Sequence, residues 1–238
     1  MILVGTSHID LQGPERLEHL LEQIQPKIIT VEISANLSLD DVADQIIEGR
    51  ATQIQRLKAT DMYESYKRLL TEIYSIRAFD ALVPIQYARA NGVEIYPVDF
   101  PSQESKAKIF RNEDKELLAI LTSIYGHRLP YDQYRKAFID WHERMFYSPE
   151  VARDLARLFN IRGTVEDKPA EEREQFMAER ILEKNPDVHL GGLAHVIDEP
   201  PIPFPVTPLY LRLGDRVSQR IRLNEVSKLY TPYGSITN

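Results

Sequence analysis

Residues 1–8 read MILVGTSH, and residues 188–195 read VHLGGLAH. In both stretches a short run rich in Val, Ile or Leu ends in glycine, and a histidine follows three positions after the last glycine. Such runs are typical of strands in a parallel sheet that helices cover on both faces. Residues 27–31 and 93–98 are also rich in Val and Ile, although no glycine and histidine follow them. The four predicted buried strands are Ile2–Val4, Lys27–Val31, Val93–Val98 and Val188–Leu190.

Amphipathic helical patterns separate these strands. Pro14 suits the first turn of one helix, and Ser38 begins a capping box for the next, whose apolar face includes Ile47. The helical pattern continues over residues 52–90, with a break expected near Pro84. Further helices are predicted at 112–125, at 131–147 and from about Pro169 to Glu183.

This alternation predicts an α/β fold: a mainly parallel sheet flanked by helices. The chain is predicted to form a single domain over 1–238, with helical insertions at about 38–92 and 102–186. Five prolines in EPPIPFPVTP (199–208) predict an extended connector; a docking motif for a polyproline-binding partner is the alternative. Residues 209–213, LYLRL, alternate like a strand, and residues 215–226 fit either a helix or a strand.

The composition argues against several classes of function. The 238 residues carry a formal net charge of −7 without a basic stripe, which argues against nucleic acid and anionic membranes as partners. There is no cysteine, so disulfides, thiolate catalysis and Cys-ligated zinc are excluded. No leader and no apolar run of membrane-spanning length is recognisable, and a cytoplasmic location is expected.

Four chemically active side chains follow the predicted strands. His8, Glu32, Asp99 and His195 come at or just after the strand ends. Ligands of open parallel sheets bind beyond the carboxyl ends of the strands. If the strands are parallel neighbours, the four side chains share one edge. The glycines before the histidines would allow a positive φ or a close approach of the backbone.

Two imidazoles and a carboxylate are the ordinary ligand set of Zn, Mn, Fe or Co, so His8, Glu32 and His195 are candidate metal ligands. Without metal, the same groups could act as a general base and its partner. The alternative is structural: histidines that cap strand ends, and a glutamate at a helix start. Asp99 is either a site acid that contacts the substrate or a turn-initiating aspartate.

Arg173 is a further candidate, because it lies four residues before Met177 and eight before Ile181 on the apolar stripe of its helix. An inward guanidinium usually pairs with a carboxylate or a bound anion; a snorkelling side chain is the alternative.

The remaining motifs are weaker. His142-Glu143 begins like the zinc motif HExxH, but Phe146 stands where the second histidine is needed. His19 is expected in solvent, and His127 and His189 have no partners at ligand spacing. The sequence contains no GxSxG, P-loop or GxGxxG motif.

Taken in order, GTSH (5–8), VEIS (31–34), VDFP (98–101), EREQFMAERI (172–181) and GLAH (192–195) resemble the TraB/PrgY–Tiki family. That family lies in the superfamily of the erythromycin esterases and the ChaN-like haem-binding proteins. The resemblance implies an EreA/ChaN-like α/β core with inserted helices and a site built from His8, Glu32, Arg173 and His195. The chain has Glu172-Arg173-Glu174 where TraB-like sequences commonly have E-R-D.

The resulting hypothesis is a hydrolase acting on a peptide, amide or ester bond of a small molecule or peptide, with a divalent Mn, Zn, Co or Fe as the implied cofactor. Arg173 would stabilise the oxyanion or hold a substrate carboxylate. The alternative is a non-catalytic protein that sequesters a peptide or haem, and a third reading is an interaction protein with a vestigial site. Assembly into a homo-oligomer stays open.

Overall fold

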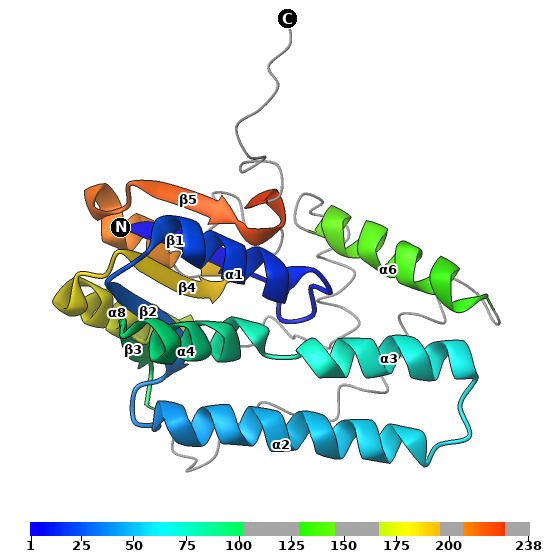
Figure 1. The fold of residues 1–238 in the computed structure, drawn as a ribbon. Coiled ribbons are helices and arrows are strands. Elements are labelled where there is room, and N and C mark those ends of the chain that lie inside the picture. The colour runs from blue at the N-terminus through cyan, green and yellow to red at the C-terminus, as the bar shows by residue number, and fades with distance from the viewer. Residues whose placement is uncertain (102–128, 146–166, 196–206, 227–238) are drawn as a thin grey trace, which may run out of the picture.

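A computed structural model describes residues 1–101, 129–145, 167–195 and 207–226. The predicted helix at 112–125 and most of the proline-rich segment lie outside these residues. The described strands form one all-parallel sheet in the order β3-β2-β4-β1-β5 (Figure 1). The α/β fold with a parallel sheet core is therefore confirmed. The strands are β1 (Ile2–Thr6), β2 (Ile28–Ser34), β3 (Glu94–Asp99), β4 (Val188–Gly192) and β5 (Gln219–Arg222).

Helices cover both faces of the sheet. On one face, β-sheet residues such as Val4 and Val31 share a buried cluster with α1 (Gly13–Ile24) and α4 (Phe79–Asn91). On the other face, Leu3 and Val98 pack with α8 (Asp167–Lys184) and α9 (Leu209–Leu213). Burial on both sides explains why the strands read as apolar runs without strict alternation.

Three helices extend beyond the sheet and form a separate hydrophobic cluster. These are α2 (Leu39–Lys58), α3 (Glu64–Ile76) and α6 (Tyr131–Met145), and their contacts include Leu69, Phe138 and Trp141 (Figure 1). Tyr134 donates a hydrogen bond to the Tyr66 hydroxyl at 3.0 Å inside this cluster. No helix among the described residues is long and apolar enough to cross a membrane.

Two expectations for the first helical segment are wrong. The chain does not break at Pro84, which lies inside α4; the turn comes at Arg77 and Ala78, where Ala78 adopts a left-handed φ of 56°. Burial of Phe79 and neighbouring side chains against the sheet outweighs the backbone hydrogen bond that Pro84 removes. Ile47, expected on the apolar face of α2, is 51% exposed.

The C-terminal segment is also corrected. Residues 209–213 form α9 and not a strand, because Leu209 and Leu213 lie four apart and are buried while Leu211 is exposed. Within residues 215–226, Gln219–Arg222 forms the edge strand β5 beside β1. In addition, β2 continues to Ser34, so Glu32 lies inside the strand and not after it.

Candidate functional site

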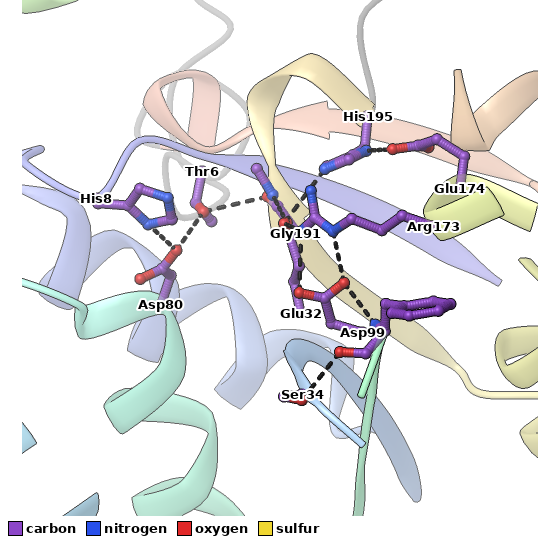
Figure 2. Close-up of polar contacts among 12 residues, drawn as sticks. Thr6, His8, Glu32, Ser34, Asp80, Asp99, Arg173, Glu174, Gly191 and His195 are labelled. Carbon is purple, nitrogen blue, oxygen red and sulfur yellow. Dashed lines mark hydrogen bonds and ion pairs between the residues drawn. The ribbon is translucent and has the colours of Figure 1, made fainter. Parts of the chain in front are cut away.

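The carboxyl ends of four neighbouring strands carry the predicted side chains. Along this edge, Asp99 ends β3, Glu32 lies near the end of β2, His195 follows β4 and His8 follows β1. All the strand pairs are parallel, so the condition for a shared edge is met. The edge divides into two connected groups, one around Glu32 and one around His8 (Figure 2).

Glu32 is the centre of the first group. Its Oε1 accepts a hydrogen bond from Arg173 Nη2 and lies 3.3 Å from His195 Nε2. Its Oε2 accepts the backbone N–H of Gly192 at 2.6 Å. Burial alone would raise the pKa of Glu32, but the charge of His195, with its hydrogen bond, and the contacts with Arg173 and Gly192 hold that pKa well below its usual value. Glu32 is therefore ionised, with a side chain that is 18% exposed.

Arg173, on α8, joins Glu32 to Asp99. Its Nε donates to Asp99 Oδ1 at 2.7 Å and its Nη2 to Asp99 Oδ2 at 3.0 Å, a two-point pairing. The prediction that this inward guanidinium pairs with a carboxylate is confirmed, and the interpretation of Asp99 as a turn residue alone is insufficient. Burial would lower the pKa of Arg173, but the bonds to Asp99 and Glu32 raise it.

His195 lies between two carboxylates. Its Nδ1 lies 2.7 Å from Oε1 of Glu174, whose side chain is nearly buried on α8, and its Nε2 faces Glu32. Burial lowers the pKa of His195, but the charges of Glu32 and Glu174 and their hydrogen bonds outweigh it and raise the pKa to about 10. His195 is thus an imidazolium at neutral pH, engaged at both ring nitrogens.

The second group is built on His8. The His8 side chain is 65% exposed, and its Nδ1 lies 2.6 Å from Oδ2 of Asp80, a residue of the first turn of α4. Burial would raise the pKa of Asp80, but His8 and the hydrogen bond from Thr6 Oγ1, at 2.9 Å, lower it. The Thr6 hydroxyl also lies 3.2 Å from the carbonyl oxygen of Gly191 and so connects the two groups (Figure 2).

The predicted metal ligands are not assembled as one set. Glu32 and His195 are in contact, whereas His8 holds Asp80. In the part of the chain that the structure describes, no cluster of three His, Asp or Glu side chains is arranged to hold a metal ion. As arranged, these donors do not fit a divalent cation, because Glu32 Oε1 faces the guanidinium of Arg173 and the imidazolium of His195. The metal stays a prediction.

The glycines of the VHLGG strand serve close approach. Gly191 and Gly192 are not among the glycines with positive φ, so that option is wrong for these two positions. A Cβ on Gly191 would lie 3.0 Å from His189 Nε2 and 3.3 Å from Glu32 Oε2, and one on Gly192 would lie 3.3 Å from Glu32 Oε2. The missing side chains make the room in which Glu32 reaches the β4 backbone.

Sequence reasoning missed three polar residues of this edge. No sequence pattern indicated Asp80, because its contact with His8 depends on how α4 packs against the sheet. Glu174 had one: it lies three residues before Met177 and seven before Ile181, on the same apolar stripe as Arg173. His189 is fully buried; burial lowers its pKa to about 3, against the charge of Glu32, and its Nδ1 lies 3.1 Å from Thr30 Oγ1.

No family model, curated protein or solved structure matches the chain. The arguments on function that follow therefore depend on the sequence motifs and on the geometry of this edge.

Proposed function

We propose that the chain is a hydrolase of the TraB/Tiki type that cleaves an ester, amide or peptide bond at the carboxyl edge of the sheet. The observation that carries the proposal is the contrast between the histidines of the two GxxH turns. His195 is enclosed by Glu32 and Glu174 and has a raised pKa, whereas His8 is exposed and contacts Asp80. Paired groups in contrasting environments are typical of acid–base sites.

His8 is the proposed general base. Asp80 engages Nδ1 and so orients the ring, and Nε2 is the proposed acceptor of a proton from water. As the water oxygen bonds to the substrate carbonyl carbon, its proton passes to His8. His8 then returns that proton to the leaving group as the scissile bond breaks. The charge of Asp80 stabilises the imidazolium formed in between.

Arg173 is the proposed substrate contact. Only Nε and Nη2 of its guanidinium take part in hydrogen bonds to described residues, and the side chain is 38% exposed. Its Nη1 is therefore a donor for the developing oxyanion or for a substrate carboxylate. Glu32 and Asp99 fix the guanidinium plane, so little reorganisation is needed when the substrate binds.

Hydrolysis assays on the purified full chain test this proposal. A suitable probe is a fluorogenic peptide library. Replacing His8 by Ala should reduce kcat/KM by about 10²–10⁴-fold, the usual contribution of a general base. The matched control is His19→Ala, since His19 is exposed on α1 and contacts Gln23. Full activity of both the His8→Ala and the His195→Ala variants would contradict the mechanism.

Two further measurements separate the rival hypotheses. Elemental analysis of the purified chain, and the effect of a chelator on turnover, test the predicted divalent metal. A Soret band on addition of haem, without turnover of any probe and with loss of the band in His8→Ala, would favour the ligand-sequestering protein and overturn the hydrolase proposal.

A further inference from the structure

A second pair of reactive side chains lies beside the site and takes no part in the function proposed above. Ser7 stands between Thr6 and His8 in the loop after β1, and its Oγ lies 2.8 Å from Nε2 of His142. His142 belongs to α6, 135 residues away in the sequence. A serine hydroxyl within hydrogen-bond distance of an imidazole nitrogen is the geometry of an activated nucleophile.

His142 has the environment of a neutral base. The residue is 2% exposed, and its ring stacks on Phe138 with centroids 6.2 Å apart. Asp10 and Glu143 are close enough to act on it electrostatically, as is Arg16. Burial and the charge of Arg16 lower the pKa of His142 more than Asp10 and Glu143 raise it, so the imidazole is neutral at pH 7 and can accept a proton.

Ionic contacts fix the two elements that carry the pair. Arg16 on α1 donates to Asp10 Oδ2 at 3.1 Å and to Glu143 Oε1 at 2.8 Å. The side-chain amide of Asn224 donates to Glu143 Oε2 at 2.9 Å. These bonds connect the loop after β1, α1 and α6. The distance between Ser7 and His142 is therefore set by a cross-linked framework, which is the pre-organisation that a nucleophile needs.

Ser7 also lies at the carboxyl edge of the sheet. It is half-buried, whereas His142 behind it is buried, and it follows the last residue of β1 directly. In open parallel sheets this edge is where ligands bind. A carbonyl compound bound at this edge would lie beside the loop that carries Ser7.

We propose that Ser7 is a nucleophile activated by His142, which forms an acyl-enzyme with carboxylic esters. Ser7 Oγ bonds to the carbonyl carbon while its proton passes to His142 Nε2. The bond to the leaving alcohol then breaks, and that alcohol takes the proton from His142. Water attacks the Ser7 ester, gives one proton to His142, and the acid leaves as Ser7 Oγ recovers the proton. The inference uses different residues from the proposed function, so the two can fail separately.

Covalent labelling of the full chain tests this inference without requiring turnover. A fluorophosphonate probe should modify Ser7, with loss of fluoride, and peptide mass spectrometry should locate the adduct. Ser34 is the matched control, since it lies at the same edge, at the end of β2, and donates its hydroxyl to Asn36 Oδ1 and to the carbonyl oxygen of Phe100. The Ser7→Ala variant should give no adduct at this position, and His19→Ala, on the exposed side of α1, should leave labelling unchanged.

A variant of the base separates activation from simple packing. His142→Gln keeps a hydrogen-bonding side chain but cannot take the proton, so labelling of Ser7 should slow by about 10²-fold or more. A thermal unfolding curve of the His142→Gln variant is the control for its folding. Labelling of Ser7 in the wild type no faster than that of Ser34, or equal labelling in a folded His142→Gln, would overturn the proposal; the wild-type comparison decides even where the variant does not fold.

Discussion

At the scale of single residues, the charge of Glu32 is the largest of the contributions from Glu32 and Glu174 that raise the pKa of His195. In Glu32→Gln the imidazole retains Glu174 but loses the carboxylate at Nε2, so the pKa of His195 should fall from about 10 toward its ordinary value near 6.5. NMR titration of the His195 ring protons measures this directly. Removing one partner of this part-buried network should also destabilise the fold, by about 1–3 kcal/mol.

A charge on the same protein but outside the network provides the control. Glu179 on α8 is exposed and contacts Gln175. The Glu179→Gln variant should leave the pKa of His195 where it is in the wild type. A His195 pKa that stays near 10 in Glu32→Gln would show that Glu174 alone maintains the imidazolium, and the central role of Glu32 would be wrong.

Gly191 leads to a second prediction for a single residue. An alanine there would place its Cβ 3.0 Å from His189 Nε2 and 3.3 Å from Glu32 Oε2, so these side chains must shift. Gly191→Ala should lower the free energy of unfolding by about 1–3 kcal/mol, as overpacking usually does, and should reduce turnover. Urea unfolding measures the first effect. If the contact with His189 is the cause, the double variant Gly191→Ala/His189→Ala should lose less stability than the sum of the two single variants. Losses that add strictly would contradict this cause.

At the scale of secondary-structure elements, the edge of the sheet was predictable and the pairing along it was not. Parallel strands end at one edge in any order, so His8, Glu32 and Asp99 could be assigned to it from sequence alone. Which side chains meet depends on strand order. Because β4 lies between β2 and β1, Glu32 contacts the turn that carries His195 and is separated from His8 by one strand.

Helix positions explain the remaining differences between sequence and structure. Arg173 was recognisable because its spacing to Met177 and Ile181 is local information. Asp80 was not, since its contact with His8 arises only when α4 docks on the sheet. The predictions of a break at Pro84 and of a strand at residues 209–213 were wrong for a related reason. Burial against the core outweighs the helix-breaking tendency of proline and the apolar–polar alternation of LYLRL.

The contact between α1 and α4 gives a prediction at this scale. A Cβ on Gly13 would lie 2.2–2.7 Å from atoms of the Phe79 ring, so the first residue of α1 packs directly on the first residue of α4. Gly13→Ala should destabilise the protein by about 1–3 kcal/mol. In a double-mutant cycle with Phe79→Leu, measured by urea unfolding, the double variant should lose less than the sum of the single losses. Additivity would contradict direct packing.

At the scale of the whole molecule, the candidate site links helices from opposite faces of the sheet. Asp80 comes from α4, on the face that α1 also covers, whereas Arg173 and Glu174 come from α8, on the other face. Their contacts meet only at the carboxyl edge, through His8 and Glu32 (Figure 2). Protonation of these groups is therefore coupled to the folding of the entire α/β core.

The pH dependence of stability follows from this coupling. The pKa of His195 is about 10 in the folded chain, above its ordinary 6.5, so its stabilisation is complete below pH 6.5 and is lost as the pH rises toward 10. His189 is the opposite case, because its pKa in the folded chain is about 3. Between pH 6.5 and pH 3 its imidazole is protonated in the unfolded chain but not in the folded chain, so the free energy of unfolding falls over this range as the pH is lowered. Lowering of the Glu32 pKa adds to the acid loss below about pH 4.5.

Urea unfolding between pH 4 and pH 10 should therefore give a maximum of stability near pH 6.5. The alkaline decline attributable to His195 should be about 3–4 kcal/mol by pH 9.5. The variant His195→Gln isolates this contribution, because it removes the titrating ring and leaves the other alkaline groups in place; its curve should be flatter than that of the wild type above pH 7. If both proteins lose stability in parallel between pH 7 and pH 9.5, His195 is not an imidazolium held by Glu32 and Glu174, and the electrostatic basis of the site is wrong.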